Sequence, residues 1–157
     1  MTPLFKQPVS VLVVIHTPQL DFLLLERAAN AGLWQSVTGS REDDEALDAT
    51  ALREVVEETG IVAPAGALTD LRLGNRFAIM QRWLGRYAPG VTHNTEHVFS
   101  LCVPAVVPVR ITPDEHTAAE WLQWQDAAEK VFSWTNRDAI HLVARTFKTP
   151  SPPRSVS

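Results

Sequence analysis

One stretch of this chain has strict internal spacing: Gly39-Ser-Arg-Glu-Asp-Asp-Glu-Ala-Leu-Asp-Ala-Thr-Ala-Leu-Arg-Glu-Val-Val-Glu-Glu-Thr-Gly-Ile61. From about Asp44 to Thr59 the residues are good helix formers, and Gly60 stands where a left-handed C-terminal cap would end a helix. Asp43 or Asp44 is expected to cap the N-terminus of that helix. The stretch therefore predicts a loop at Gly39 followed by one helix of about four turns.

The predicted helix has one apolar face and one acidic face. The apolar stripe recurs every four residues, at Leu47, Ala51 and Val55. On a neighbouring patch stand three carboxylates at i, i+3 and i+4, those of Glu54, Glu57 and Glu58. Like charges so close repel one another, and near the C-terminal end they also oppose the helix macrodipole. A divalent cation relieves both problems, and Mg²⁺ prefers carboxylate oxygens among its ligands.

A solvated helix face is the usual explanation of an acidic run taken alone. The residues that flank the run, Gly39, Glu45, Arg53 and Gly60, favour a metal site over a solvated face. Arg53 lies four residues before Glu57 and near the Glu45 side of the helix, so we expect it to orient the carboxylates. Glu45 is interpreted as an architectural residue and not as a ligand.

Length and composition indicate one small globular domain over residues 1–147, followed by a flexible tail at residues 148–157 that is rich in proline and serine. The net charge of −4 argues against binding to a nucleic-acid polymer. The single Cys102 cannot form an internal disulfide and is expected to be a small buried hydrophobe, which favours a cytoplasmic location. No signal peptide or membrane span is predicted, because the apolar run at residues 9–15 is too short to cross a bilayer.

The remaining elements follow from β-branched runs and from amphipathic periodicity. Strands are predicted at residues 8–15, 22–26, 34–38, 77–84, 96–103 and 120–124. Two further helices are predicted at residues 126–132 and 136–147, and Pro89-Gly90 marks a turn. The pattern indicates an α/β protein, with a mixed sheet covered by helices on two faces.

The stretch from Gly39 to Ile61 resembles the signature of the Nudix hydrolases, which cleave a nucleoside diphosphate linked to another group. That signature is Gly, five residues, Glu, seven residues, Arg-Glu, an aliphatic residue, any residue, Glu-Glu, any residue, Gly and an aliphatic residue. Every fixed position is satisfied here, with Val55 and Ile61 as the aliphatics. The resemblance implies a Nudix fold, an α/β/α sandwich with a mixed sheet between helices.

Segments outside the signature narrow the resemblance to the bacterial dihydroneopterin triphosphate diphosphatases of folate biosynthesis. They are Pro8-Val-Ser, Trp34-Gln-Ser-Val-Thr-Gly-Ser40, Arg86-Tyr-Ala-Pro-Gly-Val-Thr92 with Asn94-Thr-Glu96, and Ser133-Trp-Thr-Asn-Arg137 with Ala139-Ile140. The resemblance covers nearly the whole domain. It implies Mg²⁺-dependent hydrolysis of 7,8-dihydroneopterin triphosphate to the monophosphate and pyrophosphate, with Mn²⁺ as a possible substitute ion.

The resemblance also implies roles for individual acidic residues. Glu54 and Glu58 match metal ligands, Glu57 follows them, and the Glu of a Glu-His step, here Glu115, supplies a further carboxylate. Asp114 adjoins Glu115 and is an alternative at that place. Arg53 is grouped with Glu54, Glu57 and Glu58 as catalytic, and the spacing leaves open which glutamate is the general base.

The positions that match the family's phosphate- or pterin-facing contacts are Lys6, Arg27, Thr38 and Ser133. Phe77, Ala78, Ile79 and Met80 match the family poorly in sequence and are added by their distance from the segment at residues 86–90. Lys6 and Arg27 are expected to clamp phosphates, because cations at strand ends suit that task, although most such residues are surface charges. Ala28 stands where a second basic residue would strengthen the phosphate grip. Residues 77–80 are placed on a strand bordering the ring pocket.

Aromatic and imidazole side chains give weaker indications. Most tryptophans pack in cores, and Trp34, beside the signature loop, is the best candidate for stacking on a ring. His93 and His97 are interpreted as surface or loop residues and not as a metal pair.

Two other functions remain open from the sequence. A broader Nudix enzyme would hydrolyse dATP or damaged nucleotides with the same helix, and a Nudix-like sensor would bind a ligand without hydrolysis. The sensor ranks last, because all signature carboxylates are present.

Overall fold

Strand β1 (Val9–His16) is the middle of a mixed sheet in the computed structural model, which describes residues 4–148. It pairs in parallel with β6 (His93–Cys102) and antiparallel with β4 (Val37–Ser40). The other strands are β2 (Asp21–Arg27), β3 (Trp34–Gln35), β5 (Leu68–Ala78) and β7 (His116–Gln123). The path through the sheet runs β3-β2-β1-β6-β5, and β7 pairs with β2. Both faces of β1 are covered, which explains its continuous apolar run.

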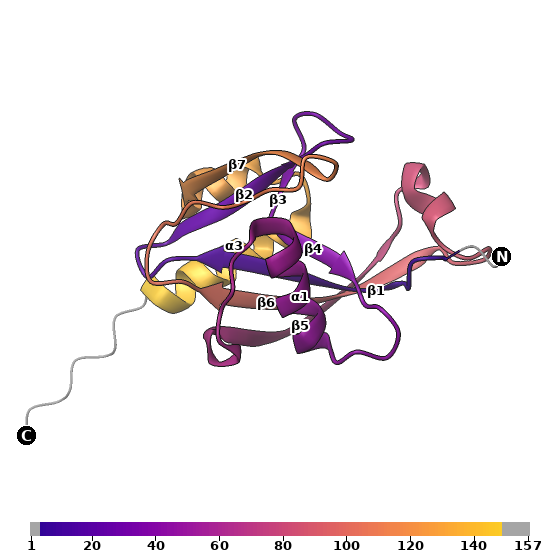
Figure 1. Cartoon of the computed structure of the whole chain (residues 1–157), viewed down its shortest axis with the longest axis horizontal. Helices are drawn as coiled ribbons and strands as arrows, with labels where there is room; N and C mark the ends of the chain where they lie inside the picture. The colour runs from indigo at the N-terminus through magenta and orange to yellow at the C-terminus, as the bar shows by residue number, and fades with distance from the viewer. Residues whose placement is uncertain (1–3, 149–157) are drawn as a thin grey trace, which may run out of the picture.

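Two hydrophobic cores lie on opposite faces of this sheet. On one face α1 (Leu47–Thr59) packs Ala51 and Val55 against residues of β1 such as Val11 and Val13. On the other face lie α2 (Trp124–Lys130) and α3 (Trp134–Lys148), whose apolar residues meet the β1 residues of opposite parity. In Figure 1 α1 lies in front of the sheet and α3 behind it. The predicted α/β/α sandwich is thereby confirmed.

The signature helix ends as predicted and begins later than predicted. Gly60 adopts φ 74° and donates its N–H to the Val56 carbonyl at 2.9 Å, so it is the left-handed cap. The N-cap of the helix is Ala46, which makes no side-chain cap hydrogen bond, so the expected cap at Asp43 or Asp44 is wrong. Asp43 has φ 50° and lies in the preceding turn. There the Glu42 N–H donates to the Glu45 carboxylate at 2.9 Å, a local hydrogen bond within the turn that precedes the helix.

The predicted strand at residues 77–84 is wrong over most of its length. β5 begins at Leu68 and ends at Ala78, and Gln81–Arg86 form a short 3₁₀ helix, η2. A bulge interrupts the β5 pairing between Asp70 and Leu73. At this bulge Arg72 has φ 53° and donates its N–H to the Asp70 carboxylate at 2.8 Å. The bulge breaks the alternation by which sequence patterns reveal strands.

Other boundaries differ by a few residues. The predicted strand at 34–38 is divided into β3 and β4, and α2 begins at Trp124, two residues earlier than expected. Another short 3₁₀ helix, η1 (Ala65–Ala67), precedes β5. The turn at Pro89-Gly90 is present, and Gly90 has φ 91°. Cys102 ends β6 and is half-buried, so it is less enclosed than expected.

Within residues 4–148 no helix is both long and apolar enough to cross a membrane. The expected tail at 148–157 falls outside the described residues, apart from Lys148 at the end of α3.

Candidate active site

Arg53 ties the start of the signature to the acidic face of α1. Its guanidinium donates to Glu45 at 2.6 Å, to Glu54 at 3.0 Å, to Glu57 at 3.2 Å and to the Ser40 carbonyl at 3.1 Å. The hydrogen bond from Arg53 lowers the pKa of Glu45 to about 2, so this carboxylate stays ionised. Glu45 thus holds Arg53, and Arg53 holds two of the three helix carboxylates, as expected for a positioning pair.

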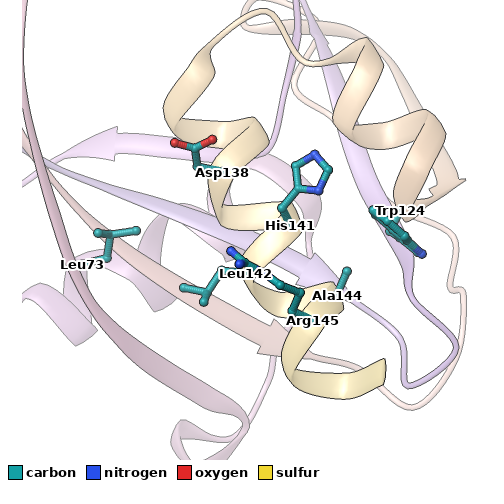
Figure 2. Close-up of a pocket in the computed structure, with 7 residues that line it drawn as sticks. All are labelled: Leu73, Trp124, Asp138, His141, Leu142, Ala144 and Arg145. Carbon is teal, nitrogen blue, oxygen red and sulfur yellow. The ribbon is translucent and has the colours of Figure 1, made fainter. Parts of the chain in front are cut away.

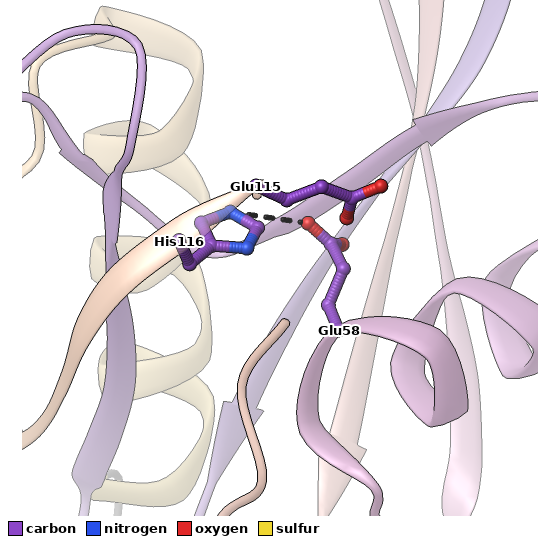
Figure 3. Close-up of side chains that lie close together, drawn as sticks. All are labelled: Glu58, Glu115 and His116. Atoms are coloured by element: carbon purple, nitrogen blue, oxygen red, sulfur yellow. Dashed lines mark ion pairs between the residues drawn. The ribbon is translucent and has the colours of Figure 1, made fainter. Parts of the chain in front are cut away.

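Glu58, Glu115 and His116 form a compact group (Figure 3). Each offers one ligand atom, and these atoms lie within 4.8 Å of one another. His116 Nε2 is 3.3 Å from Glu58 Oε1, and Glu58 Oε2 accepts the Thr38 N–H at 3.2 Å. Glu58 is 2% exposed and His116 3% exposed, whereas Glu115 is exposed. The group is therefore a buried corner with one carboxylate facing outward.

Burial and mutual repulsion disfavour ionised carboxylates at this corner. Burial, together with Glu54 and Glu115, raises the pKa of Glu58 well above its ordinary value. Burial, with the nearby Glu57, raises the pKa of Glu54 to about 7. Burial, with the Arg27 charge, lowers the pKa of His116 to about 4, so its ring is neutral at physiological pH. Carboxylate oxygens beside a neutral imidazole fit a divalent cation, whose charge would favour the ionised carboxylates.

The four predicted metal ligands do not all meet. Glu58 and Glu115 come together, joined by His116, while Glu54 and Glu57 lie outside that group. The Glu57 side chain is 51% exposed and pairs with Arg53. The Glu54 carboxyl group packs against Gly39, where any Cβ would collide with it. Asp114, the alternative to Glu115, is exposed and does not belong to the group.

A cavity of about 310 Å³ adjoins this corner at β4, because Thr38 and Gly39 line the cavity and contact Glu58 and Glu54 respectively. All eight predicted substrate contacts line it: Lys6, Arg27, Thr38, Phe77, Ala78, Ile79, Met80 and Ser133. Phe77 and Ala78 end β5, whereas Ile79 and Met80 follow it. Ser133 precedes α3, and its hydroxyl accepts the Asn136 N–H at 3.1 Å. The structure thus gathers residues from both ends of the chain around one hollow.

Three cations stand in the cavity wall: Lys6, Arg27 and Arg86. The Lys6 N–H donates to the Arg86 carbonyl at 2.9 Å, which fixes these two residues side by side. Burial and the charge of Arg86 lower the pKa of Lys6, and the same two causes lower the pKa of Arg27. Cations that repel in this way form a natural site for an anion. Arg86 supplies the second basic group that Ala28 does not provide.

The aromatic residues of the cavity differ from the sequence expectation. Trp34 packs against the α3-side core, and the Lys130 ammonium lies 4.1 Å from its ring centroid. Trp34 does not line the cavity, so its predicted stacking role is unsupported. Trp83 and Trp134 line it instead, and the Arg27 guanidinium lies 4.8 Å from the centroid of Trp83. Trp134 is 53% exposed.

His93 and His97 lie on β6 and not in a loop. Both are half-buried, neither lines the cavity, and His93 Nδ1 is 2.8 Å from the Thr92 hydroxyl.

A larger and more open hollow of about 930 Å³ lies over α3 (Figure 2). It is lined by Leu73, Trp124, Asp138, His141, Leu142, Ala144 and Arg145. The His141 ring meets Trp124 edge-on, with 5.5 Å between centroids. This hollow shares no lining residue with the cavity at β4 and contributes none of the group Glu58, Glu115 and His116. The chemistry is therefore assigned to the cavity at β4, although it is smaller than the hollow over α3.

Sequence reasoning missed three residues of this site. His116 was visible as the partner of Glu115 in the Glu-His step, but its approach to Glu58 depends on the pairing of β7 with β2, opposite Arg27. Trp83 and Arg86 both lie in η2, whereas the sequence placed Trp83 near the end of a strand and Arg86 in the segment after it. Alternation of side chains, assumed for a strand, gave no reason to bring them together.

Comparison with known proteins agrees with this geometry. The sequence profile of the NUDIX domain matches residues 6–143. The dihydroneopterin triphosphate diphosphatase of Escherichia coli K12 is 43% identical over 139 residues, which cover 87% of this chain and 91% of that protein. The Haemophilus influenzae protein of the same name is 38% identical over 141 residues, which cover 87% of each chain.

The structure of the E. coli dihydroneopterin triphosphate pyrophosphohydrolase superposes with a TM-score of 0.85 and 40% sequence identity. The superposition covers 92% of this chain and 99% of that one. The chain belongs to the Nudix hydrolase family.

Proposed function

We propose that this chain hydrolyses 7,8-dihydroneopterin triphosphate to the monophosphate and pyrophosphate, a reaction of folate biosynthesis. The names of the relatives that are 43% and 38% identical support this substrate. The structural observation that carries the proposal is the continuity of the site at β4. There Thr38 and Gly39 belong both to the cavity wall and to the surroundings of Glu58 and Glu54. A ring in the cavity would therefore direct its phosphates toward the acidic corner.

The cations and the cavity wall give the substrate its orientation. Lys6, Arg27 and Arg86 would bind the triphosphate oxygens, where Arg offers a bidentate fork and Lys a point charge. The cavity of about 310 Å³ lies at the small end of the range for ligand pockets and suits one bicyclic ring. Phe77 and Trp83 add apolar wall around the ring.

The reaction is attack of water on a phosphorus of the triphosphate, with diphosphate as the leaving group. Glu54 is our proposed general base, because Arg53 holds its carboxyl group against Gly39 at the cavity wall, and its pKa of about 7 without a bound ion lies in the range that suits proton transfer. Glu58 and Glu115, with His116 beside them, would hold Mg²⁺ or Mn²⁺, which supplies charge neutralisation at the phosphate oxygens. Arg53 keeps Glu54 and Glu57 in place through its hydrogen bonds.

We also propose that residues 1–147 act as one domain on a free small molecule in the cytoplasm. The support is the single Cys102, which offers no internal disulfide, and the net charge of −4. Neither a nucleic-acid polymer nor a membrane is part of the proposal.

The test is pyrophosphate release from a panel of triphosphates with and without Mg²⁺. Dihydroneopterin triphosphate, dATP and dGTP are compared by kcat/KM. Formation of the corresponding pterin or nucleoside monophosphate is followed separately. We expect dihydroneopterin triphosphate to give the highest value and all turnover to need the ion.

Two outcomes would replace the proposal. A clear preference for dATP would make the chain a broader nucleotide pyrophosphatase. Tight binding of a triphosphate without turnover under any ion would make it a ligand sensor.

A further inference from the structure

A carboxylate in the cavity wall, that of Glu96, has no role in the chemistry above. Glu96 and Asn94 lie two residues apart on β6, so both side chains leave the same face of the strand. Both line the cavity, although they are only 7% and 5% exposed. Their neighbours across the sheet are Asn75 and Phe77 on β5 and Ser10 on β1.

Glu96 is buried without an ionic partner. Within residues 4–148 its Oε1 has no hydrogen-bond partner, and no ion pair involves it. The Asn94 carbonyl oxygen is likewise unpartnered, while its amide donates to the Ser10 hydroxyl at 2.7 Å. Burial raises the pKa of Glu96, and the side chains of Thr135 and Asn75 only partly oppose that rise. An unpaired acceptor buried in a cavity wall is costly, so a ligand that donates hydrogen bonds there would gain affinity.

We infer that Glu96 is a specificity residue that accepts hydrogen bonds from the edge of a 2-amino-4-oxopyrimidine ring. This inference rests on the proposed function and adds the ring edge that the site reads. Such a ring presents a ring N–H and an exocyclic amino group side by side, and a carboxylate accepts from both. The carbonyl oxygen of Asn94 offers one further acceptor on the same wall.

The proposed contact selects among rings that share a triphosphate. Pterin and guanine both present the N–H and amino pair. Hypoxanthine keeps the ring N–H but lacks the amino group, and adenine places a ring acceptor where the N–H would be. An acceptor facing the buried carboxylate repels it, and a missing donor leaves one of its oxygens unpaired. The site should therefore prefer pterin and guanine over hypoxanthine and adenine.

A purely structural role for Glu96 predicts a different result. Asn75 lies directly across from Glu96, and the Asn75 amide nitrogen also lacks a partner at hydrogen-bond distance. If Glu96 served only to pair with Asn75, its replacement would alter the unfolding temperature and leave ring preference unchanged.

The experiment compares dGTP with dITP, which differ only in the 2-amino group, and includes dihydroneopterin triphosphate. In the wild type we expect kcat/KM to favour dGTP over dITP by about ten- to hundredfold, the size of a hydrogen bond to a charged group. Glu96→Gln, which is nearly isosteric, should bring that ratio close to one and raise KM for dihydroneopterin triphosphate. Inhibition by inorganic pyrophosphate should stay unchanged, because Lys6, Arg27 and Arg86 are intact. Glu129→Gln, at an exposed position of α2, is the matched control and should keep the wild-type ratio.

The results separate this inference from the proposed function. If the wild type hydrolyses dihydroneopterin triphosphate well and Glu96→Gln keeps both KM and the dGTP preference, the role of Glu96 is overturned and the proposed function stands. If dihydroneopterin triphosphate is a poor substrate while Glu96 still sets the ratio of dGTP to dITP, the proposed function fails and the edge contact stands. If Glu96→Gln alters the inhibition by pyrophosphate, Glu96→Ala is measured in its place. The inference then requires that the kcat/KM ratio of dGTP to dITP in Glu96→Ala also falls close to one.

Discussion

Glu58 is the side chain at which the acidic corner and the cavity meet. Its carboxylate contacts His116 on one side and the Thr38 N–H on the other, and it is almost completely buried. A carboxylate in this position is difficult to ionise without a nearby positive charge. The Glu58 carboxyl group is therefore expected to need a bound cation in order to be ionised in the active enzyme.

Glu58→Gln removes that charge at nearly constant volume. We expect turnover with Mg²⁺ to fall by about a hundredfold or more, while the unfolding temperature stays the same or rises, because a buried group that could ionise is replaced by a neutral one. Pyrophosphate release and thermal unfolding, measured on the same samples, check both parts. Glu129→Gln serves as the control, and near-wild-type turnover in Glu58→Gln would remove Glu58 from the metal site.

Arg27 is held in place by neighbours on three sides. It donates to Asn30 at 3.2 Å and to Gln35 at 3.2 Å, and its guanidinium stacks over Trp83. Such fixed placement lowers the entropy that is lost when a phosphate binds.

Arg27→Ala should raise KM by about tenfold or more, the size of a charge-assisted hydrogen bond, and lower kcat less. Steady-state kinetics with dihydroneopterin triphosphate provide the measurement. Arg76→Ala, at an exposed β5 position outside the cavity wall, should leave both constants unchanged. An unchanged KM in Arg27→Ala would mean that Arg27 does not hold the triphosphate.

At the scale of the elements, the contact between β4 and α1 explains the first residue of the signature. Gly39 lies on β4 in extended backbone, and its lack of a side chain lets the Glu54 carboxyl group pack directly against the strand. Gly39 is thus required for close approach and not for an unusual backbone conformation.

Gly39→Ala should push the Glu54 carboxyl group aside without unfolding the domain, because the colliding atoms belong to a side chain that can rotate. We expect kcat to fall by about tenfold or more, since a displaced base loses much of its effect, with only a small change in unfolding temperature. Steady-state kinetics and calorimetric unfolding of the same variant test these two expectations. Full activity in Gly39→Ala would show that the Glu54 position is not critical.

The elements differ in how far the sequence alone could predict them. The signature helix was predictable to its C-terminus, because Gly60 and the periodicity of Ala51 and Val55 are local signals. β5 was not, because the bulge at Asp70 and Arg72 interrupts its alternation. The cavity residues carried over from the resemblance do line one hollow. The approach of His116 to Glu58, and of Arg86 and Trp83 to that hollow, depends on tertiary contacts that no local pattern contains.

At the scale of the whole molecule, the two faces of the sheet divide the work. The face toward α1 supplies the acidic corner through Glu54 and Glu58. His116, the first residue of β7, and Glu115 just before it complete the corner. The opposite face supplies the ring cavity through β5, β6 and the segment before α3. β4 contacts both, so a single short strand joins the acidic corner to the ring cavity.

The acidic corner should also make the stability of the metal-free protein depend on pH. The folded pKa of Glu54, about 7, lies above its unfolded value of 4.5. The folded state then binds more protons than the unfolded state between these values, so this contribution to stability falls as pH rises. The pKa of Glu58 is raised in the same direction. His116 has the opposite sign, because its folded pKa of about 4 lies below 6.5 and stability is gained as pH rises through that interval.

The His116 contribution is gained mainly between about pH 4 and pH 6.5, so above this interval the carboxylates are the main groups of the corner that still act. Without added ions, the unfolding temperature should therefore fall between pH 6.5 and about pH 8. Mg²⁺ should raise it more at the higher pH, because the ion binds the ionised carboxylates. Glu54→Gln should flatten the metal-free slope, whereas Glu129→Gln should keep it. A flat wild-type profile, or an equal Mg²⁺ effect at both pH values, would mean that these carboxylates ionise without help and that the corner is not built around a cation.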